Sequence, residues 1–313
     1  MRCPSLSDLP VVPGKTGWPW DTESERLPDC RSDGTSWPRM SIITPSFNQA
    51  TFIEETIRSI LLQGYPDLEY IVIDGNSSDN SVEIIRKYEP WISYWVSEKD
   101  NSQSDAINKG FNKATGVYGN WINSDDLLCQ NALHNLAKQV HFDQDTVFIG
   151  VCLIVDKEGK LLRKQQSDIT TLEQLIDIAG YWRKAQSIAQ QAALYPVSAF
   201  KNTGALNVYN HLSMDYELWG NFLLHQYAFR YIDAEIGIFR TYQGQKISDL
   251  ANTTRSLVAS ARKILWKSPF AFFAKLSLES KLDLYYIWYL YHSFRSWIGM
   301  KRRLQNLIND GNS

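Results

Sequence analysis

Short apolar runs alternate with helical patterns between residues 40 and 130. After the first run, apolar side chains recur at helical spacing from Ile53 to Leu61, and Thr51 with Glu54 has the spacing of a capping box at the start of that helix. Alternation of strand and helix predicts βαβ units and an α/β fold, a mostly parallel sheet covered by helices. The pattern predicts strands near 41–44, 70–74, 92–96 and 117–122, and further helices near 80–88 and 103–114.

The pattern changes on either side of this region. Residues 1–39 are rich in proline and show little periodicity, which predicts an extended arm pinned to the body by Trp18 and Trp20. Residues 40–245 form the main domain, divided into halves at 40–130 and 131–245, and 246–313 form a helical C-terminal extension. Within the second half we expect a hairpin at 147–155 and 160–164, helices at 171–179 and 214–225, and a strand at 229–242.

Polar clusters follow the first, second and fourth predicted strands. They are Thr44–Asn48, Asp74–Asp79 and Asn123–Asp126. Ligands of open parallel sheets bind beyond the carboxyl ends of the strands. These three loops therefore predict one binding site at a single edge of the sheet.

The adjacent acids Asp125 and Asp126 raise the question of what compensates their charge, because burying unpaired charge costs several kcal/mol or more. Water, a basic side chain or a metal ion would each do so. Mg²⁺ or Mn²⁺ prefers a few hard oxygens, with phosphates and water completing the shell. The alternative is an ordinary acidic turn or helix start.

Two further acids have both a structural and a chemical interpretation. Asp74 ends an apolar strand, where it either initiates a turn or accepts hydrogen bonds from a nucleobase or ribose. Asp215 opens a predicted helix, where it either caps that helix or serves as a general base on an acceptor hydroxyl.

Composition describes a globular protein without an overall attraction to nucleic acid. The chain has 313 residues, 44% hydrophobic and 21% charged, with a net charge of −2. Its four scattered cysteines predict free thiols in a cytosolic protein, with a Cys3–Cys30 disulfide as the alternative. No apolar run reaches the roughly 18–20 residues needed to span a bilayer. Dinucleotide, P-loop, zinc and nucleophile-elbow motifs are absent from the sequence.

Positive charge is concentrated near the C-terminus. Residues 262–303 carry nine bases and two acids, a net charge of +7, around the aromatic stretch Leu284–Tyr291. Aromatic residues favour membrane interfaces and bases favour anionic lipid, which suggests a peripheral contact with the inner face of the plasma membrane. A helical cap on the core, or a homodimer interface, is the alternative.

Three stretches together resemble glycosyltransferase family 2: SIITPSFNQATFIEETIRSILLQGYPDLEYIVIDGNSSDNSVEII, SDAINKGFNKATG and WINSDD, with MDYELW near residue 215. The TGWPW segment of the arm also resembles some bacterial members. The resemblance implies a Rossmann-like GT-A fold. It further implies an inverting, metal-dependent hexosyltransferase that uses a nucleoside-diphosphate sugar, UDP-linked in most members, in bacterial surface polysaccharide synthesis.

The resemblance also implies roles for particular residues. Asp215 matches the catalytic base, and Asp125 and Asp126 match the acids that hold Mn²⁺ or Mg²⁺. Donor-binding positions are Thr44, Pro45, Asn48, Asp74, Asp105 and Asp125, with Asp74 matching the acid that reads the base. Acceptor-side positions are Gln190, Gln191 and Glu217, the last of which is the next candidate for the base.

One residue departs from the family pattern. Many members have an acid where this chain has Asn123, so the division of labour between Asp125 and Asp126 stays open. A sugar nucleotidyltransferase is one alternative function, but it needs a Gly-rich basic phosphate loop, and ITPSFNQ has neither glycine nor base. A non-catalytic protein that binds nucleotide sugars is the other. The expected acceptor is a hydroxyl of a glycan or lipid-linked glycan.

Overall fold

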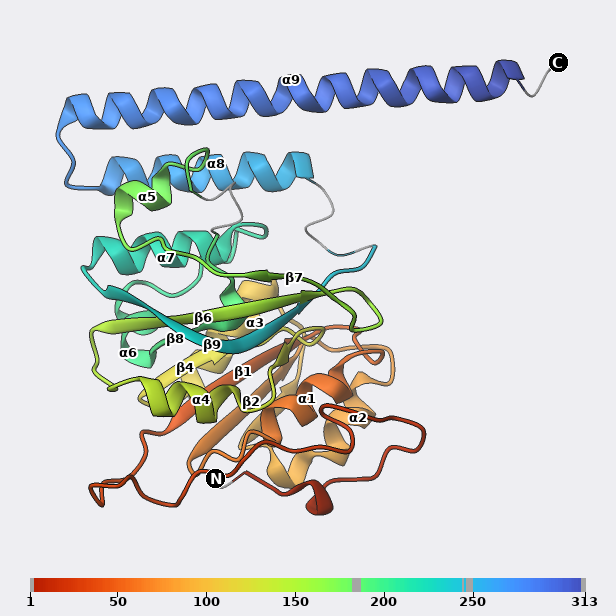
Figure 1. Cartoon of the computed structure of the whole chain (residues 1–313), viewed down its shortest axis with the longest axis vertical. Coiled ribbons are helices and arrows are strands. Elements are labelled where there is room, and N and C mark those ends of the chain that lie inside the picture. The colour runs from red at the N-terminus through yellow and green to blue at the C-terminus, as the bar shows by residue number, and fades with distance from the viewer. Residues whose placement is uncertain (1–2, 182–186, 244, 246–249, 311–313) are drawn as a thin grey trace.

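The computed structural model describes residues 3–181, 187–243, 245 and 250–310, and for residues 250 and 293–310 it describes the backbone alone. In Figure 1 a central sheet lies between two layers of helices, with the N-terminal arm below and the long C-terminal helix above. Of the predicted basic segment, the side chains of Arg295 and of residues 301–303 lie outside the described part.

Within the described residues the sheet has nine strands, in the order β3-β2-β1-β4-β8-β6-β9-β5, with β7 paired to β6. The first four of that order are parallel, as predicted, whereas β8 joins β4 antiparallel and brings the second half of the chain into the same sheet. The prediction of an α/β fold is therefore confirmed, although the second half adds antiparallel pairs. The strands are β1 (Met40–Ser46), β2 (Leu68–Asp74), β3 (Tyr94–Ser97), β4 (Tyr118–Trp121), β5 (Leu127–Leu128), β6 (Thr146–Val155), β7 (Leu161–Gln165), β8 (Ala193–Pro196) and β9 (Ala228–Arg240).

Helices cover both faces of the sheet because successive strand side chains point to opposite sides. In β1, Ile42 joins one buried cluster and Ile43 the other. The first cluster packs against α1 (Ile53–Leu61), α2 (Ser81–Lys87), α4 (Ala132–Gln139) and the arm. The second packs against α3 (Gln103–Lys113), α5 (Leu172–Ile176), α6 (Val197–Asn202), α7 (Met214–Leu224), α8 (Leu250–Lys267) and α9 (Phe272–Asp310).

The capping box predicted for α1 is wrong. Phe52 is the N-cap residue and no side chain caps the helix there. Glu54 instead accepts a hydrogen bond from the Tyr88 hydroxyl (3.1 Å) and pairs with Lys87. The carboxylate thus joins α1 to the end of α2 rather than closing its own first turn.

The arm is held to the body as predicted. The Trp18 indole donates to the Leu128 carbonyl (2.9 Å), and the buried Arg58 of α1 donates to the carbonyls of Pro10, Pro19 and Trp20. The arm contains the short helix η1 (Leu6–Asp8); η2 (Glu89–Trp91) and η4 (Gln190–Ala192) occur in the domain. Cys3 and Cys30 are free thiols, as expected.

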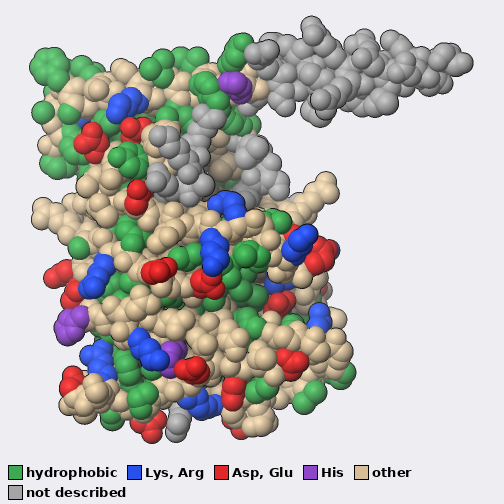
Figure 2. Space-filling model, viewed as in Figure 1, with side chains coloured by type: hydrophobic (Ala, Val, Ile, Leu, Met, Phe, Trp, Pro, Cys, Tyr) green, Lys and Arg blue, Asp and Glu red, His purple; other side chains and the backbone are tan. Residues whose placement is uncertain are grey.

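The C-terminal helices pack on the domain through one side of each. Leu278 and Leu282 of α9 are buried in the second cluster, and Arg262 of α8 pairs with Glu279 and Asp283. Other apolar residues of α9 face outward: Phe272, Phe273, Leu276, Leu284, Ile287, Trp288, Leu290 and Tyr291. Figure 2 shows apolar side chains gathered along this helix at the top of the molecule. Among the described residues, no helix combines the length and apolarity that a membrane span needs.

Candidate active site

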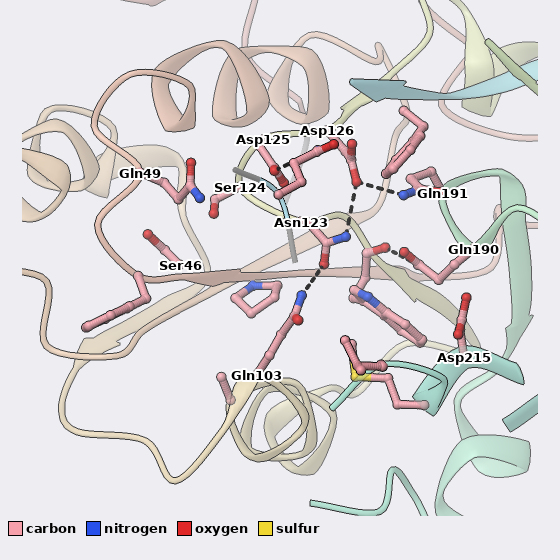
Figure 3. A pocket seen from close by; sticks show the side chains of 18 of the residues that line it. Ser46, Gln49, Gln103, Asn123, Ser124, Asp125, Asp126, Gln190, Gln191 and Asp215 are labelled. Carbon is pink, nitrogen blue, oxygen red and sulfur yellow. Dashed lines mark hydrogen bonds between the residues drawn. The ribbon is translucent and has the colours of Figure 1, made fainter. Parts of the chain in front are cut away.

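A cavity of about 840 Å³ opens where the parallel strands end, at the edge that the polar loops predict. Its walls come from the loops after β1, β2, β3 and β4, from residues 187–191, and from the start of α7. Figure 3 shows acids and amides from these segments facing one another. The sheet thus brings together residues that are more than 100 positions apart in the chain.

Of the predicted site residues, six line the cavity and five do not. Those in the lining are Pro45, Asp125, Asp126, Gln190, Gln191 and Asp215. Thr44, Asn48, Asp74, Asp105 and Glu217 lie behind it, where they bond to other parts of the protein.

Asp126 is buried and receives three N–H donors. Its carboxylate accepts from Asn123 Nδ2 (3.0 Å), Gln191 Nε2 (2.7 Å) and the backbone N–H of Arg240 (3.1 Å). Burial, with the neighbouring charge of Asp125 as a second cause, raises the pKa of Asp126 to about 8. Neutral amides therefore satisfy its hydrogen bonds but do not supply the positive charge that would keep it ionised.

Asp125 is more open than Asp126. Its Oδ2 accepts from the Tyr242 hydroxyl (2.8 Å) and from Gln245 Nε2 (3.4 Å), both beyond the end of β9. Among the described residues, Oδ1 of Asp125 receives no hydrogen bond. Of the two acids, Asp125 thus has an oxygen that a ligand can reach.

The chemistry of this pair fits a divalent cation. Within the part of the chain that the structure describes, no cluster of three or more His, Cys, Asp or Glu side chains could hold a metal. Mg²⁺, however, is commonly held by one or two carboxylates together with substrate phosphates and water. Two adjacent carboxyls, one with a raised pKa, would both be ionised beside such a cation.

Asp215 is the first acid of α7 and lies on another side of the cavity, beyond Gln190 (Figure 3). Its Oδ1 accepts the backbone N–H of Tyr216 (2.8 Å). Burial raises the pKa of Asp215 to about 6, partly opposed by hydrogen bonds from the backbone. A carboxylate with a pKa near neutrality is suited to accept a proton.

The acids behind the cavity organise its loops. Asp74 is fully buried and accepts hydrogen bonds from Ser77 N (2.9 Å), Ser77 Oγ (2.5 Å) and Ser97 Oγ (2.6 Å). Asp105 accepts from the backbone and side chain of Asn101, each at 3.0 Å. Glu217 pairs with Lys263 of α8 and accepts from Asn210.

The other two residues behind the cavity join the first two loops and strands. Asn48 has a left-handed backbone (φ 52°), and its side chain accepts from Ser78 N (2.8 Å). Thr44 is buried and accepts from the Tyr70 hydroxyl (3.1 Å). The loop after β1 is therefore fixed to the loop after β2 independently of any ligand.

Several residues of the lining were not predicted from the sequence. Three of them, together with the predicted Gln190, have buried polar atoms without a hydrogen-bond partner among the described residues: Ser46 Oγ, Asp100 Oδ2, Trp121 Nε1 and Gln190 Oε1. Buried polar atoms are normally paired, so atoms like these at a cavity indicate ligand contacts. Burial and the absence of a partner are tertiary properties, which the sequence pattern did not reveal.

Comparison with known families identifies the protein class. The profile of glycosyl transferase family 2 matches residues 41–204. The chain belongs to this family. The family that the sequence stretches resemble is thereby confirmed.

The chain is similar to known glycosyltransferases at moderate sequence identity. A glycosyltransferase of Rickettsia bellii is 30% identical over 220 residues, which are 68% of this chain and 31% of that protein. The GalNAc(5)-diNAcBac-PP-undecaprenol beta-1,3-glucosyltransferase of Campylobacter jejuni is 34% identical over 131 residues, 41% of this chain and 42% of that enzyme. The chain thus matches less than half the length of each.

Solved structures confirm the GT-A fold. S. aureus TarS 1–349 in complex with UDP-GlcNAc matches with a TM-score of 0.58 and 16% identity, covering 78% of this chain and 71% of that TarS fragment. The mannosyltransferase PcManGT from Pyrobaculum calidifontis, in complex with GDP-Man and Mn²⁺, matches with a TM-score of 0.59 and 19% identity, covering 86% and 75%.

Proposed function

We propose that this glycosyltransferase moves a hexose from a UDP-linked sugar to a hydroxyl of a lipid-linked glycan, with inversion at the anomeric carbon. The observation that carries the proposal is the joint presence of Asp125 and Asp215 in one cavity. Asp125 can hold a cation at the diphosphate, and Asp215 can accept the proton of the attacking hydroxyl.

Each residue has one task in this mechanism. Asp215 takes the proton of the acceptor hydroxyl while that oxygen forms a bond to the anomeric carbon. The bond from that carbon to the diphosphate oxygen breaks on the opposite face, so the configuration inverts without a covalent sugar–enzyme intermediate. Asp125 would hold a divalent cation with Asp126 beside it, and such a cation would supply stabilisation of the charge on the departing diphosphate.

Asp126, Asn123 and Gln191 position this site. Asp126 binds both amides, and Asn123 Oδ1 also accepts from Gln103 Nε2 (2.8 Å) across the cavity wall. Asp126 is buried and Asp125 is partly exposed. We therefore assign the direct contact with the cation to Asp125, and to Asp126 the support of the site from behind. This assignment is the division of labour that we propose for the two acids.

The acceptor side is supported by the Campylobacter jejuni relative, whose name describes a lipid-linked glycan acceptor. Gln190 and Gln191 lie between Asp126 and Asp215 in Figure 3, where an incoming hydroxyl would pass. Oε1 of Gln190, which has no hydrogen-bond partner among the described residues, is available to such a hydroxyl.

We propose that α9 brings the enzyme to the surface where a lipid-linked acceptor resides. Phe273, Leu284 and Ile287 are 82%, 67% and 61% exposed. Glu279 and Asp283 are paired with Arg262, while Lys275 lies among the outward apolar residues. Lys275 donates to the Trp266 carbonyl rather than to an acid, so this apolar face keeps a positive charge, which favours an anionic membrane over a second copy of the chain.

Liposome flotation tests this contact. The full chain should bind vesicles with 30% anionic lipid and dissociate as salt rises, and the double variant Phe273→Ser/Leu284→Ser should bind at least tenfold less. Val11→Ser, which removes an 88% exposed apolar side chain from the arm, should bind like the wild type. Unchanged flotation of the double variant, or its conversion from dimer to monomer in sedimentation, contradicts the membrane contact.

Donor turnover tests the catalytic proposal and the non-catalytic alternative. The purified chain should release UDP from a UDP-hexose in the presence of Mn²⁺, with water as the acceptor, and much less in EDTA. No release with any UDP-, GDP- or ADP-linked sugar, despite binding of the nucleotide, would favour a non-catalytic sugar-nucleotide binder.

A further inference from the structure

A second polar site lies at the end of the cavity formed by the loops after β1, β2 and β3. Ser46, Phe47, Gly75, Lys99 and Asp100 line it. It contains two of the buried polar atoms that have no partner among the described residues, Ser46 Oγ and Asp100 Oδ2. The Ser46 residue is 4% exposed and the Asp100 side chain 9%, so water reaches neither freely.

These groups converge on Gly75. Its N–H donates to the Ser46 carbonyl (2.8 Å), and a Cβ built on Gly75 would lie 3.3 Å from Asp100 Oδ2 and 3.4 Å from Phe47 Cδ2. The glycine therefore leaves open a narrow space between a carboxylate oxygen and an aromatic ring. Phe47 is 62% exposed as a residue, as a stacking platform for a planar ligand would be.

Lys109 fixes the orientation of Asp100. Its ammonium bonds Asp100 Oδ1 at 2.6 Å and Glu98 Oε1 at 2.9 Å. With Oδ1 held in this way, the carboxylate presents the single oxygen Oδ2 to the space beside Gly75. A single buried acceptor next to an aromatic ring matches a flat heterocycle that offers one N–H donor.

Asp74 is the acid that the family resemblance implies reads the base, but its carboxylate is already hydrogen-bonded within the protein. Both of its oxygens accept hydrogen bonds from Ser77 or Ser97, and it is fully buried. A base would have to displace those bonds to reach it. Asp100 has an unpartnered oxygen in the cavity, and Asp74 does not.

We propose that Asp100, held by Lys109, reads the N3–H of uracil while Phe47 stacks on the ring, which makes the enzyme selective for UDP-linked donors. Cytosine has a lone pair at N3 and would face the carboxylate oxygen as acceptor against acceptor. Guanine offers two adjacent N–H donors, which both oxygens of a free carboxylate would match, but Lys109 occupies one. This inference rests on the proposed use of a nucleoside-diphosphate sugar.

The substitution Asp100→Asn tests it by reversing the hydrogen-bond polarity. Lys109 will hold the amide oxygen, so that the amide N–H₂ faces the base and matches cytosine N3 instead of uracil N3–H. Calorimetric titration with UDP and with CDP in Mn²⁺ should show the UDP-to-CDP affinity ratio falling by about 10- to 100-fold, the scale for exchanging one matched hydrogen bond for a mismatched one.

The control is Glu98→Gln. It removes a carboxylate from the same lysine, but Glu98 is outside the cavity lining and its side chain is 53% exposed. Its affinity ratio should equal that of the wild type. An Asp100→Asn ratio unchanged within twofold, with UDP still bound, overturns the inference and leaves the proposed function intact.

Wild-type selectivity gives a second test that needs no variant. UDP should bind at least tenfold more tightly than CDP or GDP. Equal binding of GDP and UDP overturns the reading by Asp100. Absence of binding by any nucleoside diphosphate overturns the proposed function itself, and the two failures are thereby distinguished.

Discussion

On the nucleotide side of the cavity most acids have their oxygens in hydrogen bonds, with Asp100 as the exception, whereas the acceptor side presents the open acid Asp215. On the nucleotide side, in the loops after β1, β2 and β3, Asp74 and Asp105 are closed by donors from neighbouring loops. On the acceptor side, Asp215 has a hydrogen bond to the adjacent backbone N–H and a pKa raised to about 6 by burial. We call an acid closed when its oxygens accept hydrogen bonds from nearby loops, and open when an oxygen faces the cavity. A closed acid at a strand end shapes the site, whereas an open acid is available for chemistry.

Asp125 and Asp126 show the same contrast within two residues. Asp126 is buried under three N–H donors, while Asp125 has an oxygen open to the cavity. Substitutions at open acids should change turnover or ligand selectivity, and substitutions at closed acids should change stability.

The largest effect is expected at Asp215. Asp215→Asn should lower the rate of UDP release from a UDP-hexose by about 10²–10⁴-fold, the range for loss of a general base, because the amide cannot accept the proton. UDP affinity, measured by calorimetry, should stay within threefold of the wild type. Turnover within a factor of three of the wild type would place the base elsewhere, with Glu217 tested next.

The next largest effect is expected at Asp125. Asp125→Asn should lower Mn²⁺-dependent turnover about 10²–10³-fold, the scale for removing one electrostatic stabiliser of developing charge. Asp126→Asn should cost less turnover, because that side chain supports the site from behind. A larger loss for Asp126→Asn than for Asp125→Asn, with both variants folded, would reverse the assignment of the two acids.

Substitution of a closed acid should lower the free energy of unfolding. Asp74→Ala leaves the hydroxyls of Ser77 and Ser97 without their acceptor, and we expect the free energy of unfolding to fall by about 1–3 kcal/mol. Denaturant unfolding followed by circular dichroism measures this. Asp100→Ala, which removes an open carboxylate, should lower the free energy of unfolding less than Asp74→Ala does. A larger decrease for Asp100→Ala would contradict the distinction between closed and open acids.

The smallest effect is a pH dependence. Because the pKa of Asp215 is raised from the ordinary value to about 6, the carboxyl is protonated below that pH and cannot act as base. The value of kcat/KM for UDP release should therefore fall about tenfold per pH unit below pH 6. In Asp215→Asn the residual kcat/KM should not fall in this way below pH 6. If the decrease persists in that variant, the titrating group is not Asp215.

Much of the first half of the fold could be predicted from the sequence, because each strand there is a short apolar run and its helix follows directly. The strand ends then placed Pro45 and Asp125 correctly at one edge of the sheet. The capping box at Thr51 was wrong because a local motif competes with tertiary contacts, here the bond between Glu54 and Tyr88.

The rest of the site depends on contacts between distant segments. Tyr242 and Gln245 reach Asp125 from 117 and 120 residues away, and no local pattern indicates that pairing. Asp100 follows β3 within the polar stretch of residues 97–105, which we did not include among the predicted binding loops. Its importance comes from Lys109 and Gly75, which only the folded chain brings to it.

The central claim is that the open acids of one cavity serve a metal-dependent UDP-sugar transfer. Calorimetric titration of the full chain with UDP, in Mn²⁺ and then in EDTA, tests it most directly. We predict saturable one-site binding in Mn²⁺ that weakens at least tenfold in EDTA for the wild type and is insensitive to EDTA in Asp125→Asn. Equal UDP affinity with and without Mn²⁺ in the wild type, or no UDP binding in either condition, would contradict the claim.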